Sequence, residues 1–279
     1  MFRTLRQAAF DLVTPTIVLF DWHATLVDTL DAMYHALDEA LPSFEALGLS
    51  ARMVKPEESR TTDDASLVAF VREHARLHPR IKAERKISRT DIFEVLFGAD
   101  DEAKQIAHKA FNERYRNHFG EVHPFEGGER DILEELHTFD VKIGVLTNRE
   151  REFFEHEISV VEDGSWVGLF DTAVCGGDTY WRKPNPEPIL KALANLEESP
   201  GLHCWYVGDS STDVAAAKRA GCTAVLFNGA RWDKEWLEKV FPGTTEHPHQ
   251  PDVIVDSFVD FKWLFEECLV VNGRYQRPC

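Results

Sequence analysis

The sequence predicts an α/β fold, a doubly wound, Rossmann-like parallel sheet with a helical domain inserted after its first strand. Short apolar runs alternate with helix-like segments from about residue 125 onward, which is typical of a parallel sheet covered on both faces. The first apolar run lies about 120 residues before the second, an interval far longer than a normal crossover connection. Because that interval has helical periodicity, it is predicted to form a domain of its own.

Six apolar runs have the length and composition of strands. They lie at residues 17–20, 141–146, 172–175, 205–207, 223–227 and 253–255. Most of them lack strict alternation of apolar and polar residues, as expected for strands buried on both faces. Helices are predicted between them at residues 129–136, 187–196 and 211–220; the second follows the start signal KPNP, and the third ends at Gly221.

The inserted helical domain is predicted to span residues 29–120, and the Rossmann-like core to consist of residues 1–28 and 121–279. Within the insertion, apolar residues recur at helical spacing over residues 30–41, 66–77 and 91–119. The insertion also carries a basic run, which is either a solvated helix face or a surface that receives an anionic substrate. This run comprises Arg72, Arg76, Arg80, Lys82, Arg85, Lys86 and Arg89.

The charge balance limits the possible partners. The formal net charge is -17, from 48 acidic and 31 basic residues, so neither nucleic acid nor an anionic membrane is expected as a bulk partner. A phosphorylated substrate remains compatible, because a local positive pocket or a divalent cation can reverse the field. The five cysteines are scattered without a CxxC pair, which predicts no disulfide framework and favours a reducing cytoplasm. No run approaches the roughly 20 apolar residues of a membrane span.

Several polar residues are predicted to meet at the carboxyl edge of the sheet, where doubly wound folds bind their ligands. Two or three carboxylates suit Mg²⁺, and a carboxylate can also form an aspartyl-phosphate. A lysine, a hydroxyl and backbone N–H groups can hold the oxygens of a transferred phosphoryl group. The residues are Asp21 after the first strand, Thr147 and Asn148 after the second, Lys183 after the third, and Asp209 and Asp213 after the fourth.

Four ordered motifs in this set, FDWHATLVDT, LTN, RKPNPEP and VGDSSTD, resemble those of the haloacid dehalogenase-like hydrolase superfamily. The stretch LFDTAVCGGDTYWRKPNPEPILKAL, followed by WYVGDSSTDVAAAKRAG, is similar to the phosphoglycolate-phosphatase-like branch. The resemblance covers roughly residues 16–256 and implies a doubly wound core with a mobile helical cap inserted after the first motif. It also implies that Asp21 attacks phosphorus. Mg²⁺ would be bound by Asp21, Asp209 and the backbone carbonyl of His23, with Asp213 acting as a ligand or through water.

The same resemblance implies that Thr147 and the N–H of Asn148 bind phosphate oxygens and that Lys183 bridges nucleophile and phosphate. Most phosphatases of the family carry Asp two residues after the nucleophile, as general acid and then base, where this sequence has His23. Imidazole can perform both proton transfers, with an ordinary pKa of about 6.5. Three interpretations stay open: His23 as a working acid–base group, a slow or specialised enzyme, and a site that binds phosphate without useful turnover.

The sequence therefore predicts a cytoplasmic, Mg²⁺-dependent phosphatase that acts on a small phosphorylated metabolite, as a monomer or a homodimer. The alternative reaction is hydrolysis of a phosphonate C–P bond, because phosphonate-cleaving members of the family share the Asp-Trp pair that begins the first motif. Lys55 would then be a candidate for a Schiff base with the substrate. A phosphate-ligand-binding protein with slow turnover is the alternative outside catalysis.

Overall fold

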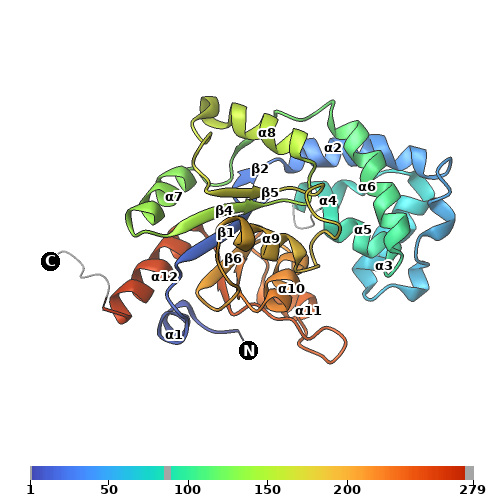
Figure 1. The fold of residues 1–279 in the computed structure, drawn as a ribbon. Helices are drawn as coiled ribbons and strands as arrows, with labels where there is room; N and C mark the ends of the chain where they lie inside the picture. Colours follow the sequence, from blue (N-terminus) through green and yellow to red (C-terminus); the bar gives the residue numbers. More distant parts are fainter. Residues whose placement is uncertain (1, 85–88, 274–279) are drawn as a thin grey trace. The chain divides into compact units, whose positions relative to one another are not determined.

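Six parallel strands form one sheet in the order β5-β4-β1-β6-β7-β8 (Figure 1). The computed structural model describes residues 2–84 and 89–273. Because β1 lies inside the sheet, with later strands on both sides of it, the winding changes direction beside β1, and the predicted doubly wound sheet is confirmed. The strands are β1 (Ile17–Asp21), β4 (Lys142–Leu146), β5 (Thr172–Val174), β6 (Cys204–Gly208), β7 (Thr223–Phe227) and β8 (Val253–Val255).

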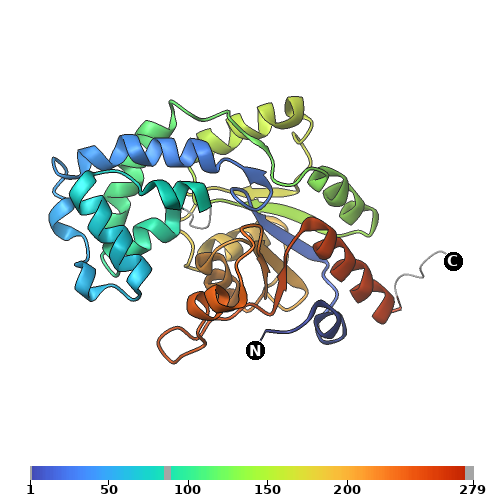
Figure 2. The ribbon, with the colours of Figure 1, turned by 180° about the vertical axis from the view of Figure 1, so that it is seen from behind.

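Helices cover both faces of this sheet (Figures 1 and 2). Side chains along β1 alternate between the faces, with Val18 and Phe20 on one and Ile17 and Leu19 on the other, so Asp21 continues the second series. The first face packs against α1 (Leu5–Asp11), α7 (Glu129–Thr138), α8 (Arg151–Val160) and α12 (Phe258–Val271). The second packs against α9 (Glu187–Asn195), α10 (Ser211–Ala220) and α11 (Lys234–Val240).

The apolar runs predicted the strands closely. Those at residues 223–227 and 253–255 coincide with β7 and β8, and the other four differ from the observed strands by one residue at one or both ends. The helix predicted at residues 211–220 coincides with α10, which ends at Gly221 in the left-handed conformation with φ 74°. Helices α1, α8, α11 and α12 were not predicted.

The chain divides into two compact units. The first contains the sheet and includes the chain up to Asp28 and from Val122 onward, and the second is Thr29–Glu121. Two short strands, β2 (Val27–Asp28) and β3 (His123–Pro124), pair antiparallel, so the chain leaves and re-enters the first unit along a two-stranded ribbon. In the described part of the chain, no helix combines the length and hydropathy that a membrane crossing requires.

The second unit is helical. The prediction of one helical segment at residues 91–119 was wrong in one respect, because this part of the chain forms two helices. Gly98 has φ +54°, and the side chain of Asp100 caps the next helix by accepting a hydrogen bond from the Ala103 N–H at 3.0 Å. The helices are α2 (Leu30–Ala40), α3 (Thr62–His74), α4 (Pro79–Glu84), α5 (Arg89–Phe97) and α6 (Asp101–Tyr115), with short 3₁₀ turns at Leu41–Phe44, Ser50–Arg52 and Pro56–Glu58.

Candidate active site

The carboxyl end of β1 brings residues from neighbouring strands to one edge of the sheet. Asp21, the last residue of β1, pairs in register with Leu146 of β4, and Phe20 pairs with Val207 of β6. The segments that follow β4 and β6 therefore emerge beside Asp21, as the sequence predicts. These segments begin with Thr147 and Asn148 after β4, and with Asp209 after β6.

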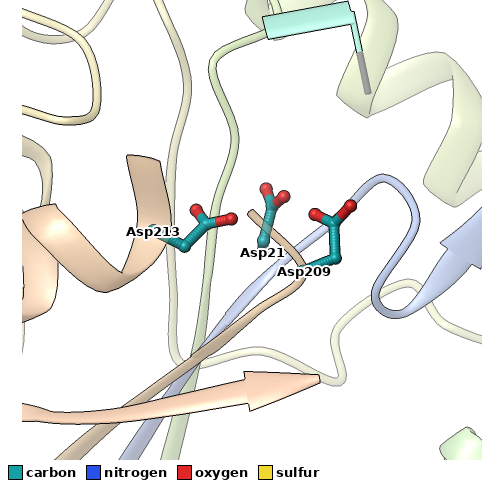
Figure 3. A group of neighbouring side chains, drawn as sticks. All are labelled: Asp21, Asp209 and Asp213. Atoms are coloured by element: carbon teal, nitrogen blue, oxygen red, sulfur yellow. The ribbon is translucent and has the colours of Figure 1, made fainter. Parts of the chain in front are cut away.

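Three of the predicted residues, Asp21, Asp209 and Asp213, form a carboxylate cluster (Figure 3). One carboxylate oxygen from each lies within 4.8 Å of the others. Asp21 and Asp213 are buried, and Asp209 is half-buried. Like charges this close repel one another, so the cluster requires cations to remain ionised. Every donor in it is an oxygen, which is the ligand type that Mg²⁺ prefers.

Lys183 supplies one cation from within the chain. Its Nζ donates hydrogen bonds to Asp21 Oδ1 at 2.7 Å, Asp213 Oδ1 at 2.8 Å and the Tyr206 hydroxyl at 2.7 Å. The backbone carbonyl of Leu146 lies 3.2 Å from the same nitrogen. The Lys183 side chain is only 3% exposed, so its charge is neutralised inside the protein rather than by water.

Burial and neighbouring charges both shift the pKa values of Asp21 and Lys183. Burial raises the pKa of Asp21 to about 6, and the positive charge of Lys183 limits the rise, while the negative charge of Asp213 adds to it. Burial alone would lower the pKa of Lys183, but the charges of Asp21 and Asp213 outweigh it, and this pKa is raised. Lys183 therefore stays protonated, and Asp21 is mostly ionised at neutral pH.

Tyr206 joins the site without having been predicted. Its hydroxyl accepts from Lys183 and donates to Asp213 Oδ1 at 2.9 Å, and its side chain lies on the same face of the sheet as Ile17 and Leu19. Burial and the nearby carboxylates hold the pKa of Tyr206 well above its ordinary value, so the phenol stays neutral. In the sequence, Tyr206 is a tyrosine within the strand CWYVG, which is buried throughout. A tyrosine in such a strand is as compatible with core packing as with a functional site.

The start of α10 fixes Asp213. The N–H of Ser210 donates to Asp213 Oδ2 at 3.1 Å as part of a capping box, and the Ser210 hydroxyl also donates to this oxygen, at 2.6 Å. Because Oδ1 is held by Lys183 and Tyr206, both oxygens of Asp213 are engaged within the protein. The approach is close, since a Cβ on Gly208 would lie 2.5 Å from Asp213 Cγ.

The turn after β4 positions the lysine segment. The side chain of Asn148 accepts from the Lys183 N–H at 3.0 Å and donates to the Lys183 carbonyl at 3.1 Å, so it holds this backbone from both sides. Arg182 donates to the Asn148 carbonyl at 2.9 Å, which gives it a structural role here. Thr147 is buried, and its hydroxyl accepts from the Arg149 N–H at 3.1 Å.

The turn after Asp21 is tight and runs back on itself. The carbonyl of Trp22 accepts hydrogen bonds from the N–H groups of Leu26 and Val27, each at 3.0 Å. Ala24 occupies the left-handed region with φ 59°, a conformation that favours glycine. His23 lies in this turn with its side chain 14% exposed.

Glu157 of α8 is the second residue that the sequence analysis missed. Its side chain has no exposed surface, and its Oε2 accepts from the Trp22 indole N–H at 2.8 Å. The same oxygen lies 3.4 Å from Nε2 of His23. A glutamate in a helix usually faces solvent, so the sequence pattern did not indicate that Glu157 contacts the first motif.

The other charged candidates lie in the second unit. Arg72 donates to the Met53 carbonyl at 3.0 Å, and Lys82 pairs with Asp38 at 2.6 Å, so these two members of the basic run have partners within that unit. Residues 85–88 of the run lie outside the described residues. The Lys55 side chain is 69% exposed and lies 3.6 Å from Glu58.

The sequence of this chain is similar to those of known hydrolases. The sequence model of the haloacid dehalogenase-like hydrolase family matches residues 18–227. A phosphoglycolate phosphatase of Salmonella paratyphi A is 30% identical over 247 residues, which cover 87% of this chain and 89% of that protein.

Solved structures repeat the fold at low sequence identity. A hydrolase from Pseudomonas syringae is 17% identical, with a TM-score of 0.60 over 90% of this chain and 97% of that chain. A CbbY variant from Rhodobacter sphaeroides, in complex with xylulose-(1,5)bisphosphate, is 20% identical, with a TM-score of 0.52 over 88% of this chain and 95% of that chain. At these identities, the likeness establishes the fold alone.

Proposed function

This chain belongs to the haloacid dehalogenase-like hydrolase family, and we propose that it is a Mg²⁺-dependent phosphatase that hydrolyses a small organic phosphomonoester through phosphorylated Asp21. The observation that carries the proposal is the buried contact between Lys183 Nζ and Asp21 Oδ1 at 2.7 Å. This contact supplies an ionised carboxylate as nucleophile and, beside it, a cation for the phosphate that the carboxylate attacks.

The carboxylate cluster is suited to the metal. Asp21, Asp209 and the backbone carbonyl of His23 are the ligands that we propose, and Asp213 supports them. The last role fits the engagement of both Asp213 oxygens by Ser210, Lys183 and Tyr206. Bound Mg²⁺ would neutralise the repulsion between the carboxylates and an incoming phosphate.

The remaining steps use groups of the chain itself. Asp21 attacks phosphorus while the Thr147 hydroxyl and the N–H of Asn148 hold phosphate oxygens. Lys183 keeps its contact with the nucleophile and neutralises charge on the transferred group. The imidazole of His23 protonates the leaving oxygen and then deprotonates the water that releases phosphate from Asp21. A positioned acid–base group of this kind contributes a rate factor of about 10² to 10⁴.

We propose that the helical unit, residues 29–120, has the function of a cap domain, and that residues 1–28 and 121–279 form the catalytic core. Caps exclude water during transfer and select the substrate. The relatives named phosphoglycolate phosphatase support a small phosphorylated metabolite as substrate, with 2-phosphoglycolate the first compound to test. The buried, free thiols of Cys175, Cys204, Cys222 and Cys268 are consistent with the cytoplasmic location that we propose.

The testing experiment is phosphate release over a panel of phosphomonoesters, with and without Mg²⁺, by the wild-type chain and Asp21→Asn. We expect Mg²⁺-dependent release by the wild type and none by the variant. Release by neither protein, with tight ligand binding, would instead favour a binding protein. The panel also includes phosphonates, and borohydride would trap a Schiff base between such a substrate and a lysine. The Lys55 side chain is 69% exposed, whereas an apolar pocket is one of the surroundings that activate a Schiff-base lysine.

A further inference from the structure

Two buried cysteines face each other from neighbouring strands, at the amino ends of those strands and therefore at the edge of the sheet opposite the candidate active site. Cys204 is the first residue of β6, and Cys222 directly precedes β7. The two strands pair in parallel with Trp205 opposite Thr223, so the register, continued by one residue, sets Cys204 opposite Cys222. Both side chains lie in the apolar layer between the sheet and helices α9, α10 and α11, so they extend from the same face.

This placement suits a disulfide bond. Neighbouring strands of a sheet lie about 4.8 Å apart. The Cα atoms of disulfide-bonded cysteines usually lie about 4.4 to 6.8 Å apart. Two thiols at facing positions on one face can therefore be joined with little movement of the backbone. Both thiols are free in this structure.

The two thiols differ in acidity. The neighbouring thiol of Cys222 raises the pKa of Cys204, and burial raises it further. The neighbouring thiol of Cys204 lowers the pKa of Cys222; burial opposes this shift, and the backbone of Gly201 adds to it. Because the thiolate is the reactive form of cysteine, Cys222 is the sulfur suited to attack an oxidant and Cys204 the sulfur that completes the bond.

We propose that Cys204 and Cys222 are a reversible oxidation site at which a peroxide converts the two thiols into a disulfide. The Cys222 thiolate attacks one peroxide oxygen, so that an S–O bond forms and the O–O bond breaks. The sulfur of Cys204 then attacks Cys222, the S–S bond forms, and the oxygen leaves as water. With hydrogen peroxide, both sulfurs are oxidised, and the peroxide takes up the two thiol protons and is reduced to two molecules of water.

A peroxide is small enough for this buried site, and both cysteines lie close to the surface along the chain. Gly221, directly before Cys222, is exposed, and Leu202, two residues before Cys204, is 56% exposed. Local opening of these turns is sufficient to admit the oxidant, because no helix or strand has to separate from the core.

The disulfide would close a segment that carries part of the candidate active site. Residues 204–222 comprise β6, α10 and the turn between them, and they include Tyr206, Asp209 and Asp213. A bond between the two ends of this segment restricts its opening. The inference does not depend on the proposed phosphatase function, since none of the atoms that react belongs to that site.

The test is treatment of the full wild-type chain with hydrogen peroxide, followed by alkylation of the remaining thiols and peptide mass spectrometry. We expect a cross-link between the peptides that contain Cys204 and Cys222, with a loss of about 2 Da that a dithiol reductant reverses. Two unmodified thiols after treatment, or sulfinic and sulfonic acids without the cross-link, would overturn the proposal.

Single substitutions test the order of the two steps. Cys204→Ser removes the second thiol, so Cys222 should be oxidised to sulfinic acid instead of forming the disulfide. Cys268→Ser, at a buried thiol of α12 on the other face of the sheet, is the matched control and should keep the cross-link. An unmodified Cys222 in Cys204→Ser would contradict its role as the attacking sulfur.

The effect on the segment is measured by hydrogen exchange of backbone amides in the oxidised and the reduced wild type. We expect exchange in β6 and α10 to slow about 10-fold on oxidation, while exchange in α7 stays unchanged. Equal exchange in both forms would show that the disulfide does not restrict this segment. Absence of phosphatase activity would contradict the proposed function alone, because neither the cross-link nor the exchange rates depend on it.

Discussion

Lys183 and Asp21 form a buried ion pair, with Nζ 2.7 Å from Oδ1, and the same ammonium lies 2.8 Å from Asp213. One cation is thus shared by two carboxylates, and the side chains of Lys183 and Asp213 are almost completely buried. Such an arrangement is strongly destabilised when its cation is removed, because two buried carboxylates are then left without compensation. The stability of the fold and the chemistry of the site therefore depend on the same contacts.

Lys183→Met should lower the free energy of unfolding by about 3 kcal/mol or more in Mg²⁺-free buffer at pH 8, because Asp21 and Asp213 lose their shared cation. Urea denaturation measures the change. Lys191→Met, at an exposed lysine of α9, is the control and should stay within about 0.5 kcal/mol of the wild type. A Lys183→Met protein as stable as the control would mean that the carboxylates are not ionised together.

Asp21→Asn should stabilise the metal-free protein at neutral pH while it removes the nucleophile. The pKa of Asp21 is about 6 in the folded chain against 3.8 for the ordinary group, so between these values the folded state binds more protons than the unfolded state. The unfolding free energy of the wild type therefore falls with rising pH in this window, by up to about 3 kcal/mol.

The measurement for this prediction is the difference in unfolding free energy between Asp21→Asn and the wild type, in EDTA, from pH 4 to pH 7.5. The advantage of the variant should grow across that range. Asp131→Asn, at an exposed carboxylate of α7, should show no such growth. A constant difference for Asp21→Asn would contradict the raised pKa.

Mg²⁺ should stabilise the folded chain, because a metal that binds only the native state adds about 2.7 kcal/mol at 100 times its Kd. Thermal unfolding with MgCl₂ and with NaCl of equal ionic strength separates binding from screening. Asp209→Asn should lose most of the shift, since it removes one charge from the carboxylate cluster. An equal shift in the wild type and the variant would place the metal elsewhere.

Tyr206→Phe should lower stability by about 1 to 2 kcal/mol and reduce kcat, because the hydroxyl that joins Lys183 and Asp213 is lost while the ring still fills its place. Urea unfolding and steady-state kinetics measure the two effects. Tyr180→Phe is the control, since that side chain is 81% exposed. If both variants behave alike, the Tyr206 hydroxyl has no role in holding the site.

The sequence predicted the sheet and the carboxylate cluster because both depend on local features. A strand buried on both faces appears as an apolar run, and Asp21 and Asp209 follow such runs directly. Parallel pairing then brings the ends of β1, β4 and β6 to one edge of the sheet. Contacts between the ends of neighbouring strands could therefore be predicted from the sequence.

Tyr206 and Glu157 could not be predicted because their roles arise from packing. A tyrosine in an apolar strand and a glutamate in a helix have ordinary sequence patterns, and only tertiary contacts bring them to Lys183 and to His23. The break at Gly98 was missed for a related reason, since an isolated glycine in a helical pattern is often tolerated.

The most direct test of the account is mass spectrometry of the peptide that contains Asp21 after acid quench during turnover. With a hydrolysed phosphomonoester and Mg²⁺, the account predicts a phosphoryl group on Asp21, absent without substrate and absent in Asp21→Asn. Phosphate release by the wild type with the phosphoryl group on another residue, or undiminished release by Asp21→Asn, would contradict Asp21 as the nucleophile.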